Sequence, residues 1–207
     1  MTKLTKAGAR RPKVFIAAYD VSRTSSEGHV AISALERLSP HLRIVLLTRQ
    51  NNADALRKDL AFRRDNPSVS VIGFDLPKWV SWWKKGGRFY QVYAYLWQLW
   101  WPVAVYVRRK PLKYIDVVHV LNFHNDSIPS LAWLLGKPTI WGPVNHNEDV
   151  PFWRQARWPT DKILRNRLKS ILRKFMWRFD PLLRLTVARM SVIIAAGPWV
   201  DKRLRIG

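Results

Sequence analysis

Short runs of apolar and β-branched residues recur along the chain, and each is followed by a turn and a longer segment with helical spacing. The runs predict strands at 13–19, 43–48, 69–74, 116–121, 138–142 and 191–196. The spacing between them predicts helices at 28–38, 53–64, 89–109, 128–135 and 161–179, with a short helix after the last strand. Because the strands are apolar throughout, we expect a parallel sheet that is covered on both faces. The pattern predicts an α/β, Rossmann-like doubly wound domain.

Polar residues gather directly after three of the predicted strands. The first strand runs into "YDVSRTSSEGH", the fourth into "HVLNFHND" and the fifth into "GPVNHNED". The carboxyl ends of parallel strands share one edge, and open α/β sheets bind ligands there. We expect these loops to meet at that edge. The candidate substrate-binding residues are Ser26, Glu27, Gly28, His124, Asn125, Gly142, Asn145, His146 and Glu148.

His119 is the candidate catalytic residue, because it lies at the end of the fourth strand near His124 and Asn125. A structural histidine held by a hydrogen bond is the alternative. The spacing of the histidines matches no common zinc pattern, so we expect no metal. The loops have alternatives too: Ser and Glu at 25–27 can form a simple helix cap, and the polar groups of 142–149 can bond their own backbone.

The length and composition indicate a single-domain protein and exclude cysteine chemistry. The chain has 207 residues, of which 48% are hydrophobic, enough for one compact domain. We expect a loose basic tail over 1–12 and one domain over 13–207, in the cytoplasm, because the N-terminal apolar run is too short for a signal peptide. There is no cysteine, which excludes disulfides, thiolate metal sites and a cysteine nucleophile.

The charge is strongly positive. There are 36 Lys and Arg against 14 Asp and Glu, a net charge of +22 that attracts phosphates on lipids, nucleotides or nucleic acid. No signature of a common nucleic-acid-binding fold is visible, so we expect no specific nucleic-acid partner, only salt-sensitive binding. The sequence also lacks the GxGxxG, P-loop and GxSxG motifs of dinucleotide-binding proteins, NTPases and α/β-hydrolases.

Two segments raise the question of a membrane. Residues 89–107 carry no charge but contain Gln, Tyr, Trp and Pro102, so a core helix, an interfacial helix and a membrane span all stay open. The predicted helix 161–179, with Thr160 as a possible cap, has one apolar stripe and one basic face. Either its stripe packs in the core and its basic face is solvated, or the basic face lies on anionic lipid. In the second case Arg165, Arg167, Arg173 and Lys174 bind the membrane.

Several segments resemble a known family. "AAYDVSRTSSEG", "VLLTR", "YAYLWQLWW" and "SVIIAAGPWVDKRL" are similar to segments of the N-terminal domain of bacterial GT-B glycosyltransferases of family 4. The most specific likeness is "YIDVVHVLNFHNDSIPSLAWLLGKPTIWGPV", with its histidine and its GPV motif. The resemblance covers nearly the whole chain.

The resemblance implies an enzyme with two Rossmann-like domains that face a cleft. The first domain holds the acceptor, and the second holds most of the nucleotide sugar through a pair of glutamates. This chain resembles the first domain only, so we expect the donor-binding domain to be absent and the fragment to be incomplete alone. Transfer would retain the anomeric configuration, with no cofactor beyond the nucleotide-sugar donor and no essential metal. The loop at Ser26 to Gly28 would lie near the diphosphate, and His119 would contact sugar or acceptor.

The sequence departs from the family after the GPV motif. Relatives usually have Gly-Gly there, whereas this chain has Asn145 and His146, and Ser127 stands where many have Arg. Glycine adopts positive φ freely, Asn less so and His rarely, so the acceptor or donor is expected to differ. The leading hypothesis is a glycosyltransferase domain acting on a lipid-linked or polysaccharide acceptor, peripheral to the cytoplasmic membrane face. The alternative is a non-catalytic half-domain that binds a membrane or a partner protein.

Overall fold

The computed structural model describes residues 10–83, 90–108, 112, 114–121, 126–145 and 150–204. Its strands are β1 (Lys13–Ala17), β2 (Arg43–Thr48), β3 (Val69–Gly73), β4 (Val117–Val120), β5 (Thr139–Val144) and β6 (Val192–Ala195). Its α-helices are α1 (Ser26–Leu38), α2 (Gln50–Lys58), α3 (Leu60–Asp65), α4 (Lys78–Ser81), α5 (Tyr90–Arg108), α6 (Phe152–Gln155), α7 (Thr160–Phe179), α8 (Pro181–Arg189) and α9 (Pro198–Leu204), and Ala132–Leu135 forms a 3₁₀ turn.

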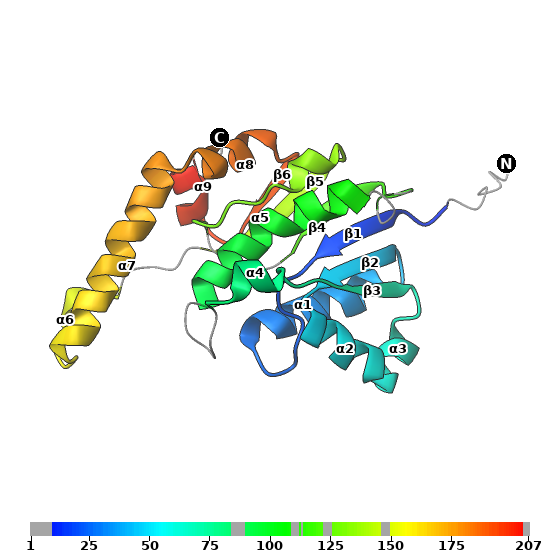
Figure 1. Cartoon of the computed structure of the whole chain (residues 1–207), viewed down its shortest axis with the longest axis horizontal. Helices are drawn as coiled ribbons and strands as arrows, with labels where there is room; N and C mark the ends of the chain where they lie inside the picture. Colours follow the sequence, from blue (N-terminus) through cyan, green and yellow to red (C-terminus); the bar gives the residue numbers. More distant parts are fainter. Residues whose placement is uncertain are drawn as a thin grey trace, which may run out of the picture.

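The strands form one parallel sheet in the order β3-β2-β1-β4-β5-β6. Helices α1, α2 and α3 cover one face, and α5 crosses the other face (Figure 1). The change of direction between β1 and β4 puts helices on both faces, because each parallel crossover is right-handed. The predicted Rossmann-like, doubly wound α/β architecture is therefore confirmed.

The predicted helices differ from the observed ones in two places. The segment 53–64 is two helices, because Asp59 leaves the helical conformation and its carboxylate accepts the N–H of Phe62, which starts α3. The segment 128–135 shortens to a 3₁₀ turn that ends at Gly136, which has a φ of 64°. Helices α4, α6 and α8 were not predicted.

Helix α5, which spans residues 90–108 of the segment predicted at 89–109, is a core helix. The indole rings of Trp97 and Trp101 on α5 are fully buried against the sheet, and Trp101 stacks on Phe15 of β1. Pro102 is also buried inside the helix. No helix in the described ranges is long and apolar enough to cross a membrane.

Helix α7 contradicts the interpretation of 161–179 as a core-packed helix. None of its residues is buried, and most of its apolar stripe is exposed. The helix extends away from the sheet and carries α6 at its far end (Figure 1). Thr160 is its first residue rather than its cap, and the preceding Pro159 makes no side-chain cap.

Candidate functional site at the carboxyl edge

The strand order changes direction between β1 and β4, and this point locates the candidate site. The two strands pair in register, with Ile16 beside His119 and Ala17 beside Val120. After β1 the chain enters α1, which packs on one face of the sheet, and after β4 the Ala132–Leu135 turn packs on the other face. Such a point opens a crevice outside the carboxyl ends of the strands, and ligands of this fold class bind there.

The loop after β1 is organised by hydrogen bonds at the start of α1. The Ser25 hydroxyl donates to Asp20 Oδ2 at 2.6 Å and accepts the N–H of Gly28 at 2.9 Å. Gly28 is buried, and a Cβ there would lie 2.2 Å from the carbonyl oxygen of Ser22. The cap interpretation is therefore correct for Ser25.

The neighbouring residues of that loop are better placed for a ligand. Ser26 is exposed and Glu27 is half-buried at the first turn of α1. The Asp20 carboxylate connects this loop to α2, because the Asn52 side chain donates to Asp20 Oδ1 at 3.3 Å. The loop thus presents two carboxylates, which accept hydrogen bonds from hydroxyl groups.

Sequence reasoning missed Arg49, which follows β2 at the same edge. Its guanidinium lies 5.3 Å from the ring centre of Tyr19 and 5.7 Å from that of Tyr93, and its Nε lies 3.8 Å from Asp75 Oδ1. The side chains of Arg49 and Asp75 are 22% and 40% exposed, so the cation is held in place but reachable. The strand-end rule that selected the other loops applies equally to "VLLTR" and would have found it.

Two tyrosines lie near Arg49 at the carboxyl edge. Burial, followed by the charges of Glu27 and Asp20, raises the pKa of Tyr90 to about 12. Burial also raises the pKa of Tyr19, whose ring meets that of Tyr90 edge to face at 5.5 Å. Both phenols stay protonated at neutral pH, and Tyr90 brings the start of α5 beside the start of α1.

His119 joins β4 to the end of β5. Its Nε2 lies 2.7 Å from the carbonyl oxygen of Gly142, which can only accept, so Nε2 carries the proton. Burial lowers the pKa of His119, although the bond to Gly142 raises it. The neutral ring therefore holds the strand ends together, which supports the structural alternative, while Nδ1 remains an acceptor.

Gly142 has a backbone conformation that only glycine adopts easily. Its φ is 129°, and a Cβ there would lie 2.4 Å from the carbonyl oxygen of Ile194 on β6. The Gly142-Pro143 peptide bond is cis. The predicted role of Gly142 in substrate binding thus stays a prediction, but its place in the fold is explained by close approach of two strands.

Described residues of the loops after β4 and β5 lie together, as predicted, whereas contact of these two loops with the loop after β1 stays a prediction. The N–H of Asp126 donates to the carbonyl oxygen of Asn145 at 3.1 Å, and the Asn145 side chain is exposed. Arg203 of α9 lies 3.7 Å from the buried Asp126 carboxylate. The predicted His124, Asn125, His146 and Glu148 lie outside the described residues.

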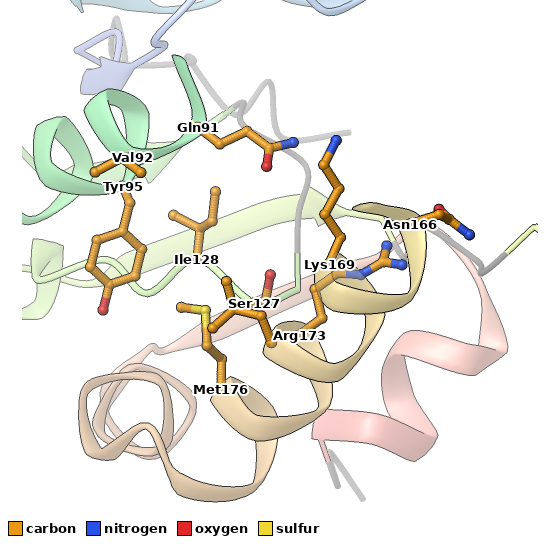
Figure 2. Close-up of a pocket in the computed structure, with 10 residues that line it drawn as sticks. Gln91, Val92, Tyr95, Ser127, Ile128, Asn166, Lys169, Arg173 and Met176 are labelled. Atoms are coloured by element: carbon orange, nitrogen blue, oxygen red, sulfur yellow. The ribbon is translucent and has the colours of Figure 1, made fainter. Parts of the chain in front are cut away.

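A pocket of about 370 Å³ opens beside this edge, between α5 and α7 (Figure 2). Its walls are largely apolar, and α7 adds two basic side chains. The lining residues are Gln91, Val92, Tyr95, Ser127, Ile128, Asn166, Lys169, Leu172, Arg173 and Met176. Arg173, predicted to face a membrane, is half-buried and lines this pocket. Apolar walls with nearby cations suit an amphiphile that carries an anionic group.

The edge therefore offers one partly buried cation, two carboxylates and the exposed phenol of Tyr90. Among the described residues no group of three metal-ligating side chains occurs. A cation that is fixed in a low-dielectric setting stabilises negative charge well.

No protein-family model matches this chain, and no curated protein matches it either.

Proposed function

We propose that this chain is the acceptor-side domain of a GT-B glycosyltransferase. It would transfer a sugar from a nucleotide-sugar donor to a lipid-linked or polysaccharide acceptor, with retention of configuration, at the cytoplasmic face of a membrane. The observation that carries the proposal is the group of Arg49, Asp20 and Glu27 at the carboxyl edge, where the charges of all three act on Tyr90. The donor-binding domain would be supplied by a segment outside this chain.

Each group has a role in such a transfer. Arg49 would stabilise negative charge on the leaving diphosphate, helped by the positive end of the α1 dipole. Glu27 and Asp20 would accept hydrogen bonds from sugar hydroxyls, and Tyr90 would donate one. His119 would position the Gly142 segment against the acceptor through its bond to the Gly142 carbonyl.

The pocket between α5 and α7 supports a lipid-linked acceptor over a free polysaccharide. Val92, Ile128 and Met176 could contact a hydrocarbon chain, and Lys169 and Arg173 could pair with its phosphate. A polysaccharide would gain little from such apolar walls.

The test joins this domain to the donor-binding domain of a related enzyme and measures sugar transfer from a panel of nucleotide sugars to a membrane lipid extract. We expect transfer from at least one donor, and a fall of about a hundredfold for Arg49→Met, the loss typical of removing one charge-stabilising group. Arg63→Met, at an exposed position on α3, is the matched control and should leave the rate unchanged. Absence of transfer from every donor, or equal rates for the two variants, would contradict the proposal.

A second candidate is a non-catalytic module that binds a membrane. It is favoured by the exposed apolar stripe of α7. The two candidates separate if the fused protein binds vesicles but transfers no sugar, which is the result that the second candidate predicts.

A further inference from the structure

Helix α7 contacts the protein along one line of its surface, which mixes polar and apolar side chains. Six residues of α7 are half-buried, and four of them form one line along the helix, because Asn166, Ser170, Arg173 and Trp177 are spaced at i, i+4, i+7 and i+11. The other two, Ile163 and Met176, lie on either side of this line. Trp177 packs against the core cluster, and Arg173 lines the pocket beside α5. This line attaches the helix to the domain.

The apolar stripe of α7 lies on the opposite side. With 3.6 residues per turn, it falls roughly half a turn away from the attached line. Its members are Leu164, Leu168, Ile171, Leu172, Phe175 and Phe179. All are between 56% and 68% exposed, and the rings of Phe175 and Phe179 lie 4.9 Å apart. A contiguous apolar patch of this kind marks a protein-binding or membrane-binding surface.

Exposed basic residues border the stripe on both sides. Arg167, Lys174 and Arg178 lie along one border, and Arg165 lies along the other. At the far end, α6 carries Trp153, which is 70% exposed, with the Arg154 guanidinium 4.8 Å from its ring centre. An apolar stripe between cations, with an exposed tryptophan at one end, is typical of a helix in a membrane interface.

Charge decides between a membrane and a second copy of the chain. Two α7 helices that paired through their stripes would bring their basic borders together, in a chain with a net charge of +22. An anionic bilayer offers the opposite charge and an apolar layer to the same surface.

We infer that α7 lies flat on an anionic lipid bilayer, with its apolar stripe inserted among the acyl chains and its basic borders at the headgroups. This surface does not depend on the proposed sugar transfer. Leu172 belongs both to the stripe and to the pocket lining, so the pocket would open next to the bilayer. The orientation assigns the main contact to the apolar stripe, with Arg165, Arg167 and Lys174 at its borders and Arg173 turned inward.

The test is flotation of the 207-residue chain with vesicles of phosphatidylcholine alone or with phosphatidylglycerol. We expect binding to the anionic vesicles and little to the neutral ones. The double variant I171N/F175N should lower partitioning about a hundredfold, because it removes two exposed apolar side chains without adding charge. The variant L60N changes an exposed leucine on α3 and should bind normally.

Variants that remove single basic residues test the electrostatic part of the vesicle binding. Arg167→Gln and Lys174→Gln should each lower anionic-vesicle binding about fivefold, and added salt should weaken it. The inference is overturned if the chain does not float with anionic vesicles, or if I171N/F175N floats like the unaltered chain. It is also overturned if sedimentation shows a dimer that I171N/F175N dissociates, since the stripe would then face a second copy.

Discussion

Helices α5 and α7 have almost the same length and opposite surroundings. The 19-residue α5 is aromatic and lies across the sheet, with Trp97 and Trp101 fully buried (Figure 1). The 20-residue α7 is rich in basic residues, yet its leucines and phenylalanines face outward. An apolar stripe on a helix therefore indicates that the helix has an apolar partner. Whether this partner is the protein's own core depends on where the neighbouring segments place the helix.

The largest change in stability is expected for a substitution in α5, the buried helix of this pair. Trp97→Ala should lower the free energy of unfolding by about 3 to 5 kcal/mol, because it leaves a cavity under α5 and removes the bond from the indole N–H to the Phe74 carbonyl oxygen. Phe175→Ala, at an exposed position of α7, should change it by less than about 0.5 kcal/mol. Urea denaturation of both variants measures the difference, and similar losses would show that α7 packs against the domain through its stripe.

A smaller effect is expected where α7 ends. The Asp180 carboxylate accepts the N–H groups of Leu182 and Leu183, which starts α8, and it also accepts the Tyr95 hydroxyl of α5. Asp180→Ala should lower the free energy of unfolding by about 1 to 2 kcal/mol. Asp180→Asn keeps an acceptor at the cap and should recover most of that loss. Equal losses for the two variants would mean that the charge, and not the cap, stabilises the junction.

His119 gives a prediction about pH. Burial lowers its pKa below the ordinary value of 6.5, so the unfolded chain binds more protons than the folded chain between the two pKa values. The stability due to neutral His119 is complete above pH 6.5 and is lost as the pH falls through 6.5 to the lowered pKa.

The measurement is the free energy of unfolding across that pH window. His119→Gln can keep the bond to the Gly142 carbonyl but cannot titrate, so its stability should fall less steeply with acid. His41→Gln, the same change at an exposed position, is the matched control. A slope that is the same in His119→Gln and in the unaltered chain would show that His119 is not held neutral.

The smallest effect concerns the exposed ion pair of Arg165 and Asp161 on α7. Arg165→Ala should change the free energy of unfolding by less than about 0.5 kcal/mol, since exposed pairs one helical turn apart contribute little. Thermal unfolding in low and high salt measures it. A larger loss would show that Arg165 has a structural partner beyond Asp161.

The sheet could be predicted from sequence because its strands are short apolar runs that need two covered faces. Helix α8 was missed, although Asp180 before Pro181 is a recognisable helix start. Arg49 was missed because the strand-end rule was applied only to clusters of polar residues, although it covers the end of β2 as well. What the sequence could not predict is the surroundings of Arg49, since Tyr19, Tyr93 and Asp75 come from three other segments. Periodicity located the stripe of α7, but it says nothing about which side of the helix meets the protein.

The proposed function requires that a phosphate-bearing sugar ligand binds at the carboxyl edge around Arg49. The direct measurement is NMR of the ¹⁵N-labelled chain titrated with a panel of nucleotide sugars and a short-chain lipid phosphate. We expect amide shifts confined to the carboxyl edge and the adjoining pocket, including Glu27, Arg49, His119 and Asn145, and their loss in Arg49→Met. Shifts confined to the basic tail over 1–12, or shifts unchanged by Arg49→Met, would contradict it.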